Sequence, residues 1–264
     1  MKVGISYNLF DGEELLESSI KSIRDNVEYI SVVYQTISNF GNDCNEDLVS
    51  LLQSLKEEGL IDELYDYKPN LKAGGHFNEI TKRNIGLFLS ERNNCTHHMA
   101  MDSDEFYTSI QFINMKNEMK EGSYDSSACQ MTTYYKEPIY RLEPKEDYYV
   151  SLLFKIKPGR RYEINCPFPV LVDPTRRMEF GKFKVFERED IEMHHMSYVR
   201  KDIRTKLTNS SASPNFKNID RLVNYYNSWE YPKQGLMGGA PDKFYDIVKE
   251  EKIGGNKLKK NLIN

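Results

Sequence analysis

The order of strand and helix signals over the first hundred residues is the feature that most limits what this chain can fold into. Apolar, β-branched or aromatic runs at 3–7, 29–36, 61–67 and 97–101 predict strands. The run at 29–36 shows little alternation, which is typical of a strand covered on both faces. Segments with helical spacing separate these runs. This order predicts an α/β fold with a Rossmann-like, mostly parallel central sheet flanked by helices.

Capping and stop signals place the helices between these strands. Asp11 and Glu14 form a capping-box pattern ahead of a helix with one apolar face. A second helix is expected between Asn45 and Gly59, because an asparagine can cap its start and a glycine its end. A third is expected over about 75–91. Each predicted strand is therefore joined to the next by a helix.

The second half of the chain is less regular. A helix is expected at 108–121, and strand-like segments lie at 129–142, 147–157, 168–178 and 183–200. No linker rich in Pro, Gly or Ser divides the chain, so we expect a single domain over 1–264. It would consist of a regular half over about 1–107 and a mixed α/β half with C-terminal helices over about 108–264.

The acidic sequence DSDE follows the fourth predicted strand. In open parallel sheets, ligands bind beyond the carboxyl ends of the strands, where this motif falls. Asp102 and Asp104 are two apart, so on an extended backbone their side chains point the same way, with Cα atoms roughly 6.6 Å apart. One Mg²⁺ or Mn²⁺ ion can lie between such carboxylates when phosphate oxygens complete its shell. Taken alone, a DxD pattern is more often a solvated strand end.

Basic and imidazole groups elsewhere have two interpretations each. Adjacent strand residues face opposite ways, so at most one of His194 and His195 is expected to join the DxD motif, and both otherwise serve as buried hydrogen-bonding groups. Arg83 either forms an i,i+4 pair with Glu79 or approaches diphosphate oxygens. The turn DPTRR (173–177) either binds an anion or is solvated.

Charge and missing motifs exclude several functions. The formal net charge of −4 gives no general attraction to nucleic acid, and the basic tail at 252–260 favours at most weak peripheral membrane contact. No leader pattern or membrane-length apolar run is found, which favours a cytoplasmic protein or a viral protein acting inside a cell. The sequence contains no GxGxxG, Walker A, GxSxG or HExxH motif, which disfavours dinucleotide dehydrogenases, P-loop enzymes, α/β-hydrolases and common zinc proteases.

Several segments in this order resemble the GT-A fold glycosyltransferases, particularly those similar to family 2. They are YNLFDGEELLESSIKSI (7–23), KRNIG (82–86), DSDEF (102–106) and MHHMSYVR (193–200). The resemblance is best over residues 1–107 and implies that this half binds a nucleoside-diphosphate sugar. The half from 108 onward would bind a glycan, lipid-linked or protein acceptor. YQTISNFGN (34–42) stands where the family has an acidic DDGS-like turn, so the choice between UDP- and GDP-sugar stays open.

The resemblance also implies a metal centre. Asp104 would ligate Mn²⁺ or Mg²⁺, and Asp102 would contact the metal or the nucleotide ribose. His195 or His194 would be the third protein ligand.

Further residues receive roles in the same way. The group expected near the nucleotide lies at strand ends or on the third helix: Tyr7, Asn8, Gln35 and Arg83. An inverting enzyme also needs a carboxylate base. Glu189 or Asp190 would serve, whereas a retaining enzyme needs no base in that role.

Two other functions fit these residues. A sugar nucleotidyltransferase has a similar sheet but usually carries a Gly-rich basic loop after the first strand, where this chain has the acidic NLFDGEE (8–14). The other is a non-catalytic module that binds a nucleotide or a metal, or in which DSDE and the histidines are structural.

Overall fold

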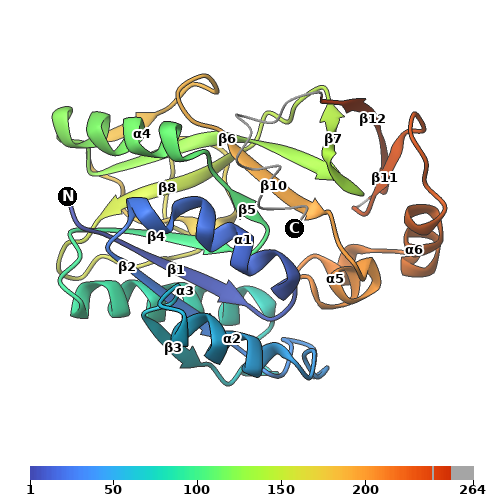
Figure 1. The fold of residues 1–264 in the computed structure, drawn as a ribbon, viewed down its shortest axis with the longest axis horizontal. Helices are drawn as coiled ribbons and strands as arrows, with labels where there is room; N and C mark the ends of the chain where they lie inside the picture. The colour runs from blue at the N-terminus through green and yellow to red at the C-terminus, as the bar shows by residue number, and fades with distance from the viewer. Residues whose placement is uncertain (240, 251–264) are drawn as a thin grey trace.

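A computed structural model describes residues 1–239 and 241–250, and the strands of its first half pair in parallel (Figure 1). The order across the sheet is β4 (His97–Asp102), β1 (Val3–Leu9), β2 (Tyr29–Tyr34) and β3 (Glu63–Asp66). All residues of β1 and β2 are buried, which explains their continuous apolar sequence. The predicted α/β fold with a mostly parallel central sheet is therefore confirmed.

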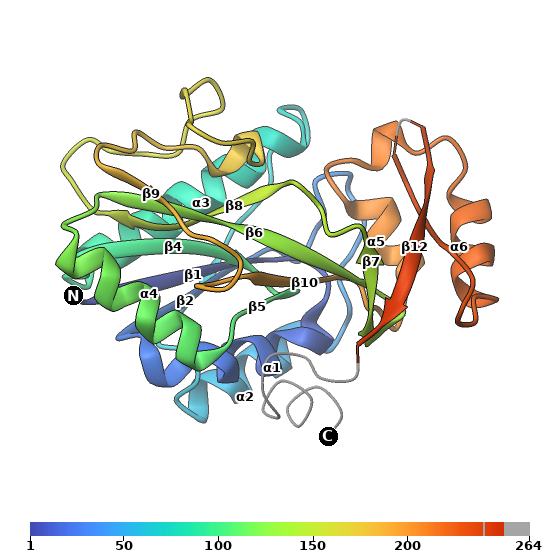
Figure 2. The ribbon, with the colours of Figure 1, turned by 90° about the horizontal axis from the view of Figure 1, so that it is seen from above.

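Helices cover both faces of this sheet (Figure 2). α1 (Glu13–Ile23), α2 (Leu48–Glu57) and α4 (Ser109–Glu121) lie on one face, and α3 (Gly75–Arg92) lies on the other. α3 packs closely against β1 because small residues meet there: a Cβ on Gly86 would lie 2.1 Å from Ser6 Oγ. This close approach brings the polar side chains of α3 to the end of β4.

The start of α1 differs from the prediction. Gly12 precedes the helix at a φ of 76°, and no side chain caps it, so the predicted capping box is wrong. Asp11 instead lines a cavity, and Glu14 Oε1 accepts a hydrogen bond from the backbone N–H of Lys201 at 3.2 Å. Both groups of the expected box therefore contact other parts of the molecule.

Strands of the second half extend the same sheet. β8 (Tyr149–Lys155) pairs antiparallel with β4, and β6 (Ser126–Tyr135) pairs antiparallel with β8. β10 (Met193–Tyr198) runs parallel to β6 and antiparallel to β5 (Glu105–Phe106), with His195 opposite Glu105. This register places β10 beside the segment that follows β4.

The remaining elements are short. They are β7 (Glu137–Glu143), β9 (Phe183–Val185), β11 (Gly235–Met237), β12 (Lys243–Lys249), α5 (Ile203–Asn209) and α6 (Ile219–Asn227), with 3-10 turns at Arg24–Asn26, Pro174–Arg176 and Ser213–Asn215. The expected strand-like segment 183–200 is split by a turn into β9 and β10, and a 3-10 turn occupies the end of 168–178.

Two sequence expectations concern membranes. Among residues 1–239 and 241–250, no helix combines the length and apolar character that a membrane span requires. The basic tail at 252–260 lies outside the described residues.

Candidate functional site

A cavity of about 490 Å³ opens at the carboxyl ends of β1, β2 and β4. Asn8 from β1, Gln35 after β2 and Asp102 from β4 line it, together with Arg83 from α3. α5 and the loop after it contribute a further wall, over 206–215. The cavity therefore lies at the sheet edge where open α/β sheets bind ligands.

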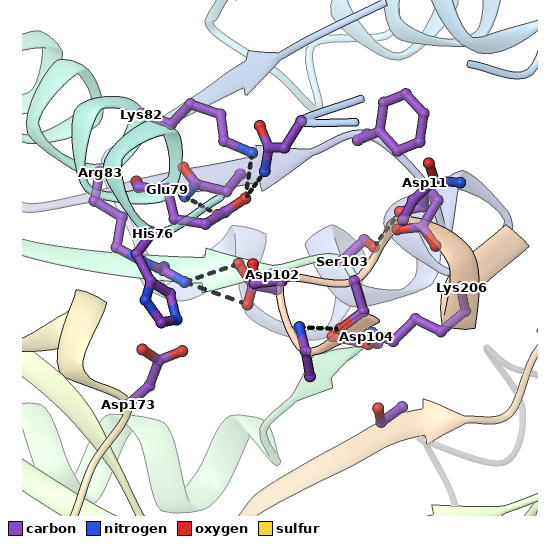
Figure 3. Close-up of a pocket in the computed structure, with 18 of the residues that line it drawn as sticks. Asp11, His76, Glu79, Lys82, Arg83, Asp102, Ser103, Asp104, Asp173 and Lys206 are labelled. Atoms are coloured by element: carbon purple, nitrogen blue, oxygen red, sulfur yellow. Dashed lines mark hydrogen bonds and ion pairs between the residues drawn. The ribbon is translucent and has the colours of Figure 1, made fainter. Parts of the chain in front are cut away.

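Asp102 is held by two guanidinium groups, of which Figure 3 shows that of Arg83. Arg83 Nη2 lies 3.4 Å from Oδ1, and Arg176 Nη2 lies 2.7 Å from Oδ2. Arg176 also pairs with the buried Glu105. Burial alone would raise the pKa of Asp102, but the charges of Arg83 and Arg176 outweigh it and hold that pKa well below its usual range. The carboxylate is therefore ionised and already paired.

Asp104 is held in the same way by different side chains. Its Oδ2 lies 2.5 Å from Arg200 Nη2 and 3.0 Å from Lys206 Nζ. Burial opposes ionisation, yet the charges of Lys206 and Arg200 keep the pKa of Asp104 far below its usual range. Gly12 makes room for Arg200, because a Cβ at Gly12 would lie 1.7 Å from Arg200 Nη1.

The structure separates the two adjacent histidines. His195 Nε2 lies 3.7 Å from Asp104 Oδ1, and the residue lines the cavity. Burial lowers the pKa of His195 to about 4, so the imidazole is neutral at neutral pH. His194 lies on the other face of β10, where Tyr134 Oη is 2.9 Å from Nδ1. His194 therefore does not reach the acidic motif, as expected for one of two neighbours on a strand.

Tyr7 does not line the cavity and is fully buried. Its hydroxyl lies 3.0 Å from Ser19 Oγ of α1. Contrary to the expectation for Tyr7, its side chain does not reach the cavity, because it shares the face of β1 that packs against α1. Asn8 points to the α3 face and hydrogen-bonds to Glu79.

Glu189 and Asp190 lie outside both cavities described here and are exposed to solvent. They belong to the turn before β10. The structure therefore does not bring Glu189 or Asp190, the predicted candidates for the catalytic base, to either cavity.

The other predicted residues do meet at the cavity: Asn8, Gln35, Arg83, Asp102, Asp104 and His195 all line it. In the described part of the chain, Asn8 Oδ1, Gln35 Oε1 and Arg83 Nη1 are buried and have no hydrogen-bond partner. Leaving a buried polar group unpaired costs about 1–3 kcal/mol. Two acceptors at the strand ends and one guanidinium donor on α3 are thus available to a polar ligand.

Three of the basic groups at the motif were not expected there. Arg176 belongs to the DPTRR turn, for which the sequence indicates either anion binding or solvation. Arg200 ends the MHHMSYVR segment. Lys206 lies on α5 with no motif around it, so no sequence signal pointed to it.

These ion pairs decide whether the residues fit a metal ion. Among residues 1–239 and 241–250, no group of three or more His, Cys, Asp or Glu side chains is arranged to hold one. Asp102 and Asp104 face guanidinium or ammonium partners rather than a common point. The Mn²⁺ or Mg²⁺ centre expected from Asp102, Asp104 and His195 or His194 is therefore not formed by this donor set.

A second cavity of about 280 Å³ adjoins the first. Both are lined by Asp102, Tyr148, Asp173, His195 and Ser197. Glu146 lines the second cavity but not the first. Burial raises the pKa of its carboxyl group, and Oε2 accepts a hydrogen bond from the Thr133 N–H at 3.0 Å. The acidic motif thus lies between two spaces, each with its own set of polar groups.

Comparisons with known proteins give structural matches only. No family model and no curated protein matches the chain. A structure of S. aureus TarS, residues 1–349, is 10% identical with a TM-score of 0.48, and the match covers 80% of this chain and 66% of that one. TarS in complex with UDP-GlcNAc is 13% identical with a TM-score of 0.39, covering 52% and 36%.

A further match is the mannosyltransferase PcManGT from Pyrobaculum calidifontis, in complex with GDP-Man and Mn²⁺. It is 12% identical with a TM-score of 0.36, and the match covers 52% of this chain and 36% of that one. The chain thus spans less than two thirds of the length of the matched chain in each of these three structures.

Proposed function

We propose that the chain is a glycosyltransferase that moves a sugar from a nucleoside-diphosphate sugar, a UDP- or GDP-sugar, to a hydroxyl acceptor. One observation carries this proposal: a single cavity at the carboxyl edge of the sheet combines unpaired acceptors near β1 and β2 with cationic groups around the DxD motif. Its volume of about 490 Å³ lies within the range of small-molecule sites. The family resemblance of the sequence points to the same ligand.

The two ends of the cavity suit the two ends of such a donor. Gln35 Nε2 donates to the backbone oxygen of Ile37 at 2.7 Å, which leaves Oε1 as an acceptor for an N–H or O–H of the nucleoside. Arg83 and Lys206 line the part of the cavity at the DxD motif, where negative oxygens of the diphosphate are best neutralised. The nucleoside would therefore lie toward β2 and the diphosphate toward Asp104.

Charge development explains how this arrangement promotes transfer. When the bond between the anomeric carbon and the diphosphate breaks, negative charge grows on the leaving oxygen and positive charge on the sugar. Fixed cations near the leaving oxygen and carboxylates near the sugar lower the barrier, because they are already in place and need little reorganisation. Lys206 and Arg83 would stabilise the leaving group, and Asp102 lies where the two cavities meet.

The second cavity would hold the acceptor, whether a glycan, a lipid-linked saccharide or a protein. Asp173 lines both cavities, so it is placed to face a donor in one and an acceptor hydroxyl in the other. Its Oδ1 accepts hydrogen bonds from the Thr175 N–H and hydroxyl, at 2.7 and 2.8 Å, which fix the carboxylate. We assign the catalytic base of an inverting reaction to Asp173 in place of Glu189 or Asp190.

Binding measurements test the proposal first. A thermal-shift panel of UDP, GDP, CDP and dTDP, with and without Mn²⁺, should single out one nucleotide. A ligand at a hundred times its Kd adds about 2.7 kcal/mol to the unfolding free energy, which raises the melting temperature by roughly 5–10 °C. Gln35→Leu should weaken that shift. Gln53→Leu, an exposed glutamine on α2 that lies outside the cavity, should leave it unchanged.

Product analysis separates the proposal from its alternatives. With a sugar nucleotide and an acceptor, a glycosyltransferase releases the nucleoside diphosphate. A sugar nucleotidyltransferase instead releases pyrophosphate from a nucleoside triphosphate and a sugar phosphate. A flat thermal-shift panel, under every combination of nucleotide and metal, would contradict the proposal and favour a non-catalytic module.

A further inference from the structure

We infer that the chain binds the donor diphosphate without a divalent metal ion, because Lys206, with Arg200 behind it, supplies the positive charge at Asp104. The inference rests on the proposed function and concerns how the same cavity holds its ligand. Asp104 then acts as a positioning residue for Lys206 rather than as a metal ligand.

The contacts at Asp104 leave little room for a metal ion. Divalent ions such as Mg²⁺ bind carboxylate oxygens at about 2.0–2.1 Å and need several such oxygens around them. Oδ2 of Asp104 already accepts from Arg200 Nη2 at 2.5 Å and from Lys206 Nζ at 3.0 Å. An ion at coordination distance from Oδ2 would stand directly against two positive groups. Among residues 1–239 and 241–250, the ion-pair partner of Oδ1 is His195 Nε2, at 3.7 Å.

Asp102 repeats this pattern, so the second half of the motif does not compensate. Arg176 and Arg83 contact its two oxygens. Among the described residues, the carboxylates of the DSDE segment, Asp102, Asp104 and Glu105, contact four cationic side chains: Arg83, Arg176, Arg200 and Lys206. Each carboxylate of the motif is thus already neutralised by at least one cationic side chain, although Asp11, Glu79 and Asp173 add further carboxylates to the cavity wall. An incoming metal ion would have to displace these cations from the motif, whereas a diphosphate could bind to them directly.

Lys206 is the most exposed cation of this cluster and so the one best placed to meet the ligand, with Arg83 beside it in the cavity wall. Its side chain is 22% exposed and lines the cavity, whereas the Arg200 side chain is only 3% exposed. The ammonium group has three N–H donors and gives one to Asp104, so it has donors left for phosphate oxygens. Figure 3 shows Lys206 reaching from α5 to Asp104 along the cavity.

Arg200 and α5 hold Lys206 in this position. Arg200 Nε donates to the backbone oxygen of Ser197 at 3.4 Å, and its guanidinium occupies the space that Gly12 leaves open. The start of α5 is fixed by Asp202, whose carboxylate accepts from the backbone N–H groups of Arg204 and Thr205 at 2.9 and 3.3 Å. The Lys206 ammonium group therefore reaches the cavity from a short helix whose start is fixed by Asp202. Its partner, the Asp104 carboxylate, is itself held by Arg200.

Calorimetric titration in the presence and absence of metal tests the inference. The nucleoside diphosphate that gives the largest thermal shift is titrated into the full chain, once with EDTA and once with Mn²⁺. We expect the same Kd within about twofold in both buffers. Lys206→Met should raise the Kd about tenfold to a hundredfold in both, as expected for a lost charge-assisted hydrogen bond. Lys206→Arg should restore most of the affinity.

Lys201→Met is the matched control. It removes one exposed lysine just before α5, outside the cavity, and should bind like the wild type. If Lys206→Met does not fold, Lys206→Gln, which retains a donor toward Asp104, replaces it.

Three results would overturn the inference. Binding that EDTA abolishes and Mn²⁺ restores would reject it and leave the proposed function intact. A Lys206→Met variant with wild-type affinity would also reject it. The absence of binding to every nucleotide in both buffers would reject the proposed function itself, and the inference with it.

Discussion

The substitution Asp104→Asn separates two accounts of the acidic motif through its effect on stability. A bare metal site collects carboxylates that repel one another, so the removal of one charge from the metal-free protein is neutral or stabilising. In this structure Asp104 instead neutralises the buried Arg200, and the two side chains are each 3% exposed. The amide would leave the guanidinium buried without a counter-charge.

The size of the loss follows from that burial. Breaking a buried ion pair on one side costs about 3–5 kcal/mol, because the remaining charge stays uncompensated. Lys206 adds little to this cost, since its side chain is 22% exposed and can turn to water. We therefore expect Asp104→Asn to lower the free energy of unfolding by about 3 kcal/mol.

Urea denaturation in EDTA measures this effect and its origin. The midpoint should fall while the slope with denaturant stays the same. Adding Arg200→Met removes the stranded charge, so the double variant should recover at least about 1 kcal/mol relative to the sum of the two single effects. A neutral or stabilising Asp104→Asn, or additive effects in the double variant, would refute the ion-pair account.

The remaining predictions address the neighbouring groups. Gly12→Ala should cost at least about 1 kcal/mol more unfolding free energy than Gly59→Ala, because both glycines have a φ of 76° but only Gly12 has Arg200 in the way; equal losses in urea denaturation would contradict this. Burial, and then the charge of Arg83, lower the pKa of His98 to about 3, below its unfolded value of about 6.5. The stability that His98 contributes is thus complete above pH 6.5 and is lost as the pH falls, by about 2–3 kcal/mol at pH 4.5; a His98→Asn variant whose unfolding free energy falls as steeply with pH as that of the wild type would be inconsistent with this assignment. Asp173→Asn should keep nucleotide affinity while transfer falls by about 10²–10⁴; near-normal transfer would exclude Asp173 as the base.

The sheet and one wall of the cavity could be predicted because both follow from local patterns. Continuous apolar runs specify buried parallel strands, and the carboxyl ends of such strands meet at one edge. Asn8, Gln35 and Asp102 lie at the ends of those runs or just after them, so their gathering required no knowledge of long-range packing. Arg83 was predictable for a similar reason, since it lies on the helix that leads into β4.

The rest of the site depends on contacts between distant parts of the chain. Arg200 and Lys206 meet Asp104 across about a hundred residues, through the pairing of β10 with β5, and nothing in the local sequence specifies that register. Tyr7 was expected in the cavity beside Asn8, but adjacent residues on a strand point to opposite faces of the sheet, and Tyr7 points to α1. The motif alone suggested a metal because its neutralising cations lie elsewhere in the sequence.

A crystal structure of the chain soaked with Mn²⁺ and the nucleoside diphosphate that it binds tests the central claim most directly. Anomalous scattering from manganese locates any bound ion without ambiguity. We predict that the nucleotide binds in the cavity next to Asn8 and Gln35 and that its diphosphate contacts Lys206. We also predict no manganese peak between Asp102 and Asp104. A manganese peak bridging those two carboxylates, with Lys206 and Arg200 turned away, would contradict the account.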